Sequence, residues 1–143
     1  MEIRQAQEDD VDAICAVDQF AEVEEKRRQF IRTSVREGLA FVALVNGEVV
    51  GYSVLEHSFF GRGFISMLMV HPDYRRRSIG SALVRHVEGL CRSDRLFTST
   101  NESNLAMRAL LEKLRYTRSG VVDDLDPGDP ELIFSKQLRG AGA

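Results

Sequence analysis

Apolar residues recur along this chain with two different periods. Short runs of apolar and β-branched residues predict strands, whereas apolar residues three and four positions apart predict helices. The predicted strands are Met1–Gln7, Leu39–Val45, Val49–Leu55, Phe64–Val70, Leu96–Thr100, Thr117–Leu125 and Leu132–Leu138. The predicted helices begin after a cap at Asp9, run over Glu22–Glu37, follow Pro72 and follow Asn104. This order, β-α-α-β-β-β-α-β-α-β-β, predicts an α/β fold with a mixed sheet of about seven strands flanked by about four helices.

Turn-forming residues separate these elements. Asn46-Gly47 lies between two predicted strands and is a strong signal for a tight hairpin, and Phe59–Gly63 predicts a second turn. Gly38 is placed to end the second helix. We expect Leu132–Leu138 to be an exposed edge strand, where a second copy of the chain can pair.

Composition narrows the class of protein. The chain has 143 residues, of which 43% are hydrophobic and 29% charged, as expected of a single globular domain over 1–143. No apolar run approaches the ~20 residues that span a bilayer, and the opening MEIRQAQEDD does not resemble a secretory signal. A cytoplasmic location without membrane contact is therefore expected. Cys15 and Cys91 lack metal-ligand spacing, so no metal is expected.

The most informative segment is a strand–turn–helix junction rich in arginine. The net charge is −3, which disfavours nucleic acid as a partner and requires any anion site to be a local patch. Such a patch follows Pro72, where Arg75–Arg77 precede the small residues Ser78, Gly80 and Ser81 at the start of a helix. Unpaired amides and the helix dipole favour an anion at such a start. A solvated turn is the alternative, but the combination favours a small anionic ligand such as a pyrophosphate.

Two motifs resemble those of the GNAT superfamily of acyl-CoA-dependent N-acetyltransferases. The family pattern Arg/Gln-x-x-Gly-x-Gly/Ala follows a strand ending Val-x-Pro, and here Arg75–Gly80 follows Val70-His71-Pro72. Ser78 replaces the first glycine, so we expect any departure in loop geometry there, because serine adopts positive φ less readily. The second pattern, Asn-x-x-Ala-x-x-Leu-Tyr-x-Lys-x-Gly-Phe, aligns with Asn104–Tyr116. The order of elements agrees over nearly the whole chain.

The resemblance implies a GNAT-like fold with acetyl-CoA between two parallel strands, Phe64–Val70 and Leu96–Thr100. It implies direct attack of a primary amine on the thioester, without a covalent enzyme intermediate. By the same resemblance, backbone groups of the first strand hold the pantetheine, the arginine junction holds the pyrophosphate, and the second motif's asparagine contacts the pantetheine region. The implied cofactor-binding residues are Leu68, Met69, Val70, Arg75, Arg76, Arg77, Ser78, Ile79, Gly80, Ser81 and Asn104.

The acid and base positions depart from the family pattern. Leu111 occupies the position of a frequent general-acid tyrosine, and Ser66 lies near the position of a strand glutamate that some members use as base. Glu56 and His57, at the end of a predicted strand, and Tyr116 are the other catalytic candidates, although a solvated strand end and aromatic packing are the favoured explanations for them. Deprotonation through water and nearby carbonyl groups is the alternative to any of these side chains.

Three functions are compatible with these features. We expect an N-acetyltransferase acting on an amine of a small molecule, peptide or protein, with a homodimer compatible by family analogy. An acyl-CoA-binding regulatory module with little or no transferase activity is the alternative, because Leu111 and Ser66 are poor acid and base groups. A nucleotide-phosphate binder unrelated to CoA is the third. The acidic stretch Asp123, Asp124, Asp126, Asp129 and Glu131 either attracts an amine or only forms a turn.

Overall fold

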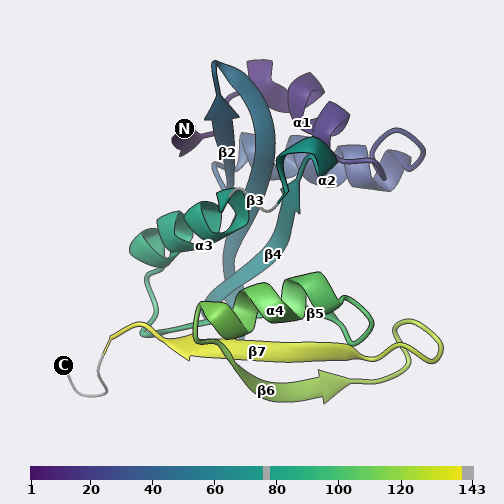
Figure 1. Ribbon diagram of the computed structural model, residues 1–143, viewed down its shortest axis with the longest axis vertical. Helices are drawn as coiled ribbons and strands as arrows, with labels where there is room; N and C mark the ends of the chain where they lie inside the picture. The colour runs from purple at the N-terminus through teal and green to yellow at the C-terminus, as the bar shows by residue number, and fades with distance from the viewer. Residues whose placement is uncertain (76–77, 140–143) are drawn as a thin grey trace. The chain divides into compact units, whose positions relative to one another are not determined.

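Seven strands and four α-helices follow one another in the predicted order in the computed structural model, which describes residues 1–75 and 78–139 (Figure 1). The strands are β1 (Glu2–Gln5), β2 (Ala40–Val45), β3 (Glu48–Phe59), β4 (Arg62–Val70), β5 (Arg95–Asn101), β6 (Thr117–Val122) and β7 (Glu131–Gln137). The α-helices are α1 (Val11–Val17), α2 (Glu25–Arg36), α3 (Ile79–Leu90) and α4 (Leu105–Lys113), and the short 3-10 helices are η1 (Glu8–Asp10) and η2 (Pro72–Tyr74). The predicted fold class is confirmed.

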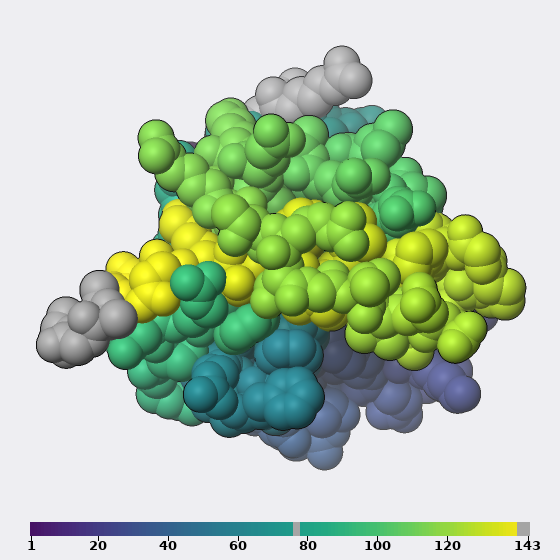
Figure 2. All heavy atoms as spheres, turned by 90° about the horizontal axis from the view of Figure 1, so that it is seen from below, coloured from purple at the N-terminus to yellow at the C-terminus, as the bar shows by residue number. Residues whose placement is uncertain are grey.

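The strands form one mixed sheet. Its hydrogen-bonded neighbours follow the order β1-β2-β3-β4-β5-β7-β6. The β4–β5 pair is parallel, whereas β1–β2, β2–β3, β5–β7 and β6–β7 are antiparallel. Strand β7 has a neighbour on each side, so the expectation that Leu132–Leu138 forms an exposed edge is wrong. The edge strand there is β6, whose six residues are all exposed (Figure 2).

The predicted turns between strands are present, with one shift of boundary. Asn46 and Gly47 have φ of 52° and 79°, the left-handed pair that a tight hairpin requires, which confirms that prediction. The second turn is tighter than predicted, because Phe60 and Gly61 also have positive φ, 52° and 78°. Strand β3 therefore continues past Leu55 to Phe59, and β4 begins at Arg62.

Other boundaries differ for local reasons. Asp9 does not cap the first helix but lies inside η1, and the carboxylate of Asp10 instead accepts the Gln7 N–H at 2.7 Å. Helix α2 starts later than predicted because turns at Phe20 occupy the preceding residues. Strand β6 ends at Val122 because Asp124, with φ of 71°, takes a left-handed conformation that interrupts the extended chain.

The chain forms two compact units, which are described separately. The first comprises Met1–Leu55 and Met67–Gly89, and the second comprises Glu56–Ser66 and the chain from Leu90 onward. In the first unit, α1 and α2 pack on one core cluster with β2 and β3, and α3 packs on another (Figure 1). In the second, α4 lies along β5 and β7 (Figure 1). Leu96, Leu111 and Leu132 are completely buried there.

A buried carboxylate anchors the segment between α1 and α2 in the first unit. Asp18, 0% exposed, accepts hydrogen bonds at Oδ2 from the Tyr52 hydroxyl (2.5 Å) and Arg27 Nη1 (2.7 Å). Its Oδ1 accepts the backbone N–H of Phe20 at 3.0 Å. Burial, together with the neighbouring Asp18 carboxylate, raises the pKa of Tyr52. Three donors thus compensate the loss of solvent around the charge.

Candidate functional site

The arginine junction predicted from the sequence begins where β4 ends. His71 caps η2, since its Nδ1 accepts the backbone N–H of Asp73 at 3.1 Å, and Pro72 occupies the first position of that short helix. The Nε of Arg75 donates to the carbonyl of Val70 at 3.1 Å, which fixes the exposed arginine against the strand end. Its two terminal guanidinium nitrogens take no part in this bond. Arg76 and Arg77 lie outside the described residues.

Ser78 begins α3 in a left-handed conformation. Its φ is 64°, and its carbonyl accepts the N–H of Ala82 at 3.0 Å, the first bond of the helical ladder. Serine therefore adopts here the left-handed conformation that a glycine would adopt without strain. The amides of Ile79, Gly80 and Ser81 follow at the positive end of the helix dipole.

The first turn of α3 packs tightly on the sheet of the first unit. Ile79 and Leu83 are buried in a cluster with Val50, against which the side chains of Leu68 and Val70 also pack. A Cβ added to Gly51 would lie 3.0 Å from the Met69 carbonyl oxygen and 3.3 Å from Leu83 Cδ1, so glycine permits this close approach. The partly buried side chains of Leu68, Met69 and Val70 pack against the core clusters of the first unit, and the binding of pantetheine by their backbone groups stays a prediction.

The two parallel strands pair over only three residues each. Residue pairing covers only Gly63–Ile65 with Leu96–Thr98, although β4 continues to Val70 and β5 to Asn101. The Thr98 hydroxyl donates to the Ile65 carbonyl at 2.9 Å at the last paired position. The next residue of β4 is Ser66, whose buried Oγ has no hydrogen-bond partner.

The second motif caps a helix in the second unit. Asn104 is the N-cap of α4, with Oδ1 accepting the N–H of Met107 at 3.1 Å. Its carboxamide nitrogen takes no part in this bond. Leu111, on the same helix, is 0% exposed, which confirms that it serves packing. The role of Asn104 in binding pantetheine stays a prediction.

The other catalytic candidates occupy different settings. The Nε2 of His57 accepts the backbone N–H of Arg92 at 3.0 Å, and burial together with Arg92 lowers the pKa of this histidine. The lone pair that a base needs is therefore engaged in holding a turn, and Glu56 beside it is half-buried within β3 rather than at its end. Tyr116 is 4% exposed, with Lys136 Nζ 5.5 Å from its ring centroid, as expected of core packing.

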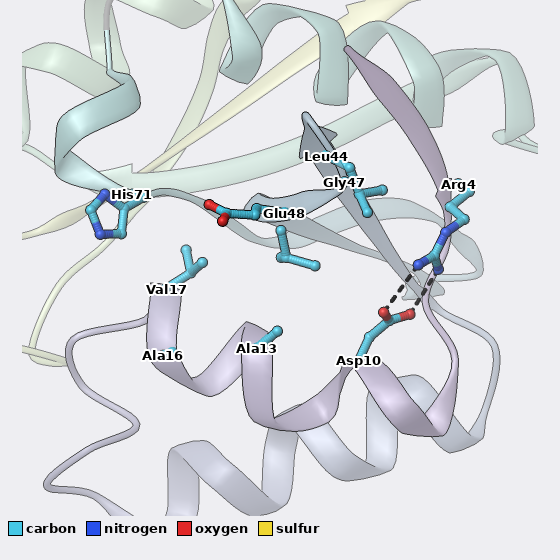
Figure 3. Close-up of a pocket in the computed structure, with 10 residues that line it drawn as sticks. Arg4, Asp10, Ala13, Ala16, Val17, Leu44, Gly47, Glu48 and His71 are labelled. Carbon is cyan, nitrogen blue, oxygen red and sulfur yellow. Dashed lines mark hydrogen bonds and ion pairs between the residues drawn. The ribbon is translucent and has the colours of Figure 1, made fainter.

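A pocket of about 400 Å³ opens in the first unit between α1 and the β2–β3 hairpin (Figure 3). Arg4 donates to both carboxylate oxygens of Asp10, at 2.7 and 3.1 Å, on one side, and lowers the pKa of this acid. Glu48 and His71 lie on the other side (Figure 3). Small apolar side chains of α1 form its floor, and no sequence pattern marked it in advance.

Glu131, a partly buried acid at the β5–β7 pair, was also not predicted as a site of its own. Glu131 is the first residue of β7 rather than part of the acidic turn, and Oε2 of its carboxylate accepts the Ser99 hydroxyl at 2.6 Å. Only the alternation of apolar residues after Pro130 could have placed it in the strand. Asp126 and Asp129, by contrast, receive hydrogen bonds from Asn101 and Ser103 and form the turn.

Within residues 1–75 and 78–139, no group of three or more histidine, cysteine, aspartate or glutamate side chains could hold a metal ion. Cys15 and Cys91 are buried free thiols, and burial raises the pKa of Cys15. No described helix is long and apolar enough to cross a membrane.

Comparisons with known proteins agree with this geometry. The sequence profile of the acetyltransferase (GNAT) family matches residues 3–116. N-alpha-acetyltransferase 30 of Xenopus laevis is 37% identical over 89 residues, which cover 56% of this chain and 32% of that protein. This chain thus spans about a third of that relative's length. A GNAT acetyltransferase from Bacillus cereus ATCC 10987 is 32% identical, with a TM-score of 0.89 over 95% of this chain and 96% of that one. An aminoglycoside 6'-N-acetyltransferase solved with coenzyme A shares the fold, with 16% identity and a TM-score of 0.82 over 98% of each chain.

Proposed function

This chain belongs to the acetyltransferase (GNAT) family, and we propose that it transfers the acetyl group of acetyl-CoA to a primary amine. The family match and the Bacillus cereus enzyme, which resembles the chain over nearly its full length, support the activity. The name of the Xenopus laevis relative favours the α-amino group of a peptide or protein as acceptor. A small-molecule amine is the other acceptor class. A cytoplasmic location and a homodimer stay predictions.

The start of α3 is the observation that carries this proposal. Ser78 turns the chain so that the amides of Ile79, Gly80 and Ser81 lie in the first turn of a helix of 12 residues. The ligand group in question, a diphosphate, is negatively charged. The helix dipole and these donors fit an anion, and Arg75 adds a fixed cation beside them. We propose that Arg75–Ser81, including Arg76 and Arg77, hold the pyrophosphate of acetyl-CoA. Backbone groups of Leu68–Val70 would align its pantetheine arm, and Asn104 is proposed to contact the same arm.

Acetyl-CoA, when bound, supplies an activated thioester that an amine attacks directly. The chain's own contribution is then to position the two reactants and to polarise the carbonyl through backbone N–H groups. A buried Leu111 cannot donate a proton and His57 Nε2 is engaged, so we propose that the amine loses its proton to solvent through water held by nearby backbone carbonyls. Glu56 and Ser66 remain candidates for this role.

A regulatory module that binds acyl-CoA without chemistry is the second candidate function. The complete burial of Leu111 favours it, because this position offers no acid to the leaving thiolate. The CoA thiolate is only a weak base, however, so it can leave without being protonated by an acid of the protein. The two functions differ in one measurable quantity, the release of CoA thiol in the presence of an amine.

The test is a thiol-release assay with acetyl-CoA and a panel of peptide and small-molecule amines, together with calorimetric titration of CoA. Arg75→Ala removes a charge-assisted donor worth about 1.5–3 kcal/mol, so the Kd for CoA should rise roughly 10- to 100-fold. Arg85→Ala, at an exposed arginine on α3, is the matched control and should leave the Kd unchanged. Tight CoA binding without thiol release across the panel would establish the regulatory module. Equal CoA affinity in both variants would show that the pyrophosphate lies elsewhere.

A further inference from the structure

The β5–β7 pair in the second unit has two unlike faces. Register places Ser99 opposite Ile133 and Asn101 opposite Glu131, so these side chains share a face with Phe97. The alternate residues Leu96, Thr98 and Leu132 are almost completely buried on the face that α4 covers. Residues Phe97, Ser99, Glu131 and Ile133 are only half-buried. This second face, opposite α4, is therefore partly accessible.

The Glu131 carboxylate is oriented by a hydrogen bond from a neighbouring strand. The Ser99 hydroxyl donates to Glu131 Oε2 at 2.6 Å across the strand pair, which orients the acid on the accessible face. Within the described ranges 1–75 and 78–139, no lysine, arginine or histidine nitrogen lies within 4.0 Å of this carboxylate. A partly buried carboxylate gains more from an ammonium than an exposed one does, because water screens the pair less.

An unpartnered hydroxyl lies next along the same face. The parallel ladder of β4 and β5 ends at Ile65 opposite Thr98, so Ser66 and Ser99 are the first residues beyond it. Side chains alternate along a strand, and both serines therefore share the face of the paired Phe64 and Phe97. The Ser66 Oγ is buried and has no hydrogen-bond partner among the described residues. A ligand N–H placed here would satisfy it.

Aromatic side chains border this pair of serines. The Phe59 and Phe64 rings stack with centroids 4.8 Å apart, and Phe59 lies 5.1 Å from Phe97. All three rings are half-buried, and half-buried Ile133 lies opposite Ser99. The face thus combines one anionic group, one hydroxyl that lacks a partner and an apolar border. An ammonium attached to an apolar group matches all three.

We propose that Glu131, held by Ser99, binds the ammonium group of the acceptor, and that the acceptor carries an apolar side chain next to this amine. This inference rests on the proposed function, because the amine is the substrate of acetyl transfer. Ser66 Oγ accepts one N–H of the same group, and the Phe59–Phe64–Phe97 cluster contacts the apolar side chain. Glu131 is thus a specificity-determining residue rather than a base: it selects a cationic acceptor and places its nitrogen beside Ser66 and Ser99, at the end of the β4–β5 ladder.

Steady-state kinetics with a synthetic peptide that begins with leucine and has a free α-amine tests this assignment. Glu131→Gln should raise the KM for the peptide at least tenfold and leave the KM for acetyl-CoA unchanged. Asp124→Asn is the matched control: it removes one negative charge from an exposed acid with φ of 71°, a conformation that asparagine tolerates, and should change neither constant more than twofold. An unchanged peptide KM in a folded Glu131→Gln protein would overturn the inference.

A binding measurement separates this inference from the proposed function. Leucinamide should shift the amide NMR signals of Ser99 and Ile133 in the wild-type protein, whereas 4-methylpentanamide, which lacks the amine, should not. Ser99→Ala serves as a second variant that keeps the carboxylate, and it should weaken leucinamide binding less than Glu131→Gln does. Absence of acetyl transfer with intact leucinamide binding would overturn only the transferase proposal. Absence of these leucinamide shifts, or equal shifts in Glu131→Gln, would overturn the role of Glu131.

Discussion

Ser78 offers a direct test of how the start of α3 is built. The residue has a φ of 64°, a conformation in which an L side chain crowds the backbone and glycine does not. The family pattern places glycine at this position, and serine replaces it here. Ser78→Gly should therefore relieve strain without moving the chain.

The expected gain follows from two opposing effects. A left-handed backbone costs a non-glycine residue about 1–2 kcal/mol. Glycine loses about 0.5–1 kcal/mol more conformational entropy on folding than a residue with a side chain. The difference predicts that Ser78→Gly raises the free energy of unfolding by about 0.5–1 kcal/mol.

Urea unfolding followed by circular dichroism measures this change. Ser58→Gly is the matched control: it makes the same replacement at an exposed position of β3, where no positive φ is recorded. There only the entropy loss acts, so the control should lose about 0.5–1 kcal/mol. Opposite signs for the two variants would support the left-handed start of α3. A loss of stability in both would refute it.

Three other changes test contacts within the two units. Tyr52→Phe removes a 2.5 Å hydrogen bond to the buried carboxylate of Asp18 and should lower the free energy of unfolding by about 1.5–3 kcal/mol in urea titrations. Gly51→Ala places a Cβ 3.0 Å from a backbone carbonyl and should cost about 1–3 kcal/mol, with a parallel loss of CoA affinity by calorimetry. The pKa of His57 lies below the usual 6.5, so the folded protein binds fewer protons there than the unfolded chain. The free energy of unfolding should therefore fall as the pH drops from 7 through this lowered pKa. In chemical denaturation at pH 5 to 7, His57→Ala should flatten this dependence on pH. An unchanged slope would contradict the bond to Arg92.

Local patterns in the sequence were enough to predict the order of elements. Asn46-Gly47 forms the predicted hairpin because each residue tolerates positive φ, and Asn104 caps α4 because its side chain reaches a helix amide. The buried face of the helix that carries Leu111 was also predicted, because burial against a sheet requires apolar residues at helical spacing. The two family motifs added the acetyl-CoA assignment, which periodicity alone does not contain.

Features that depend on distant residues were not predictable. The position of β7 between β5 and β6 is set by tertiary packing and not by local sequence. For this reason the strand Leu132–Leu138 was wrongly predicted at an edge of the sheet. The engagement of His57 by Arg92 joins residues 35 positions apart, and the Ser99–Glu131 bond joins residues 32 apart. Neither spacing leaves a local signature, because strand register brings Ser99 and Glu131 together and the turn after α3 brings the Arg92 N–H to His57.

Acetyl-CoA binding in the proposed site depends on contacts of the amides from Ser78 to Ser81 with the diphosphate of coenzyme A. Amide NMR titrations with coenzyme A and with pantetheine, which lacks the diphosphate, test it most directly. If these contacts form, the amide signals of the four residues shift with coenzyme A and remain in place with pantetheine. Saturable coenzyme A binding that leaves the four signals unmoved would contradict it.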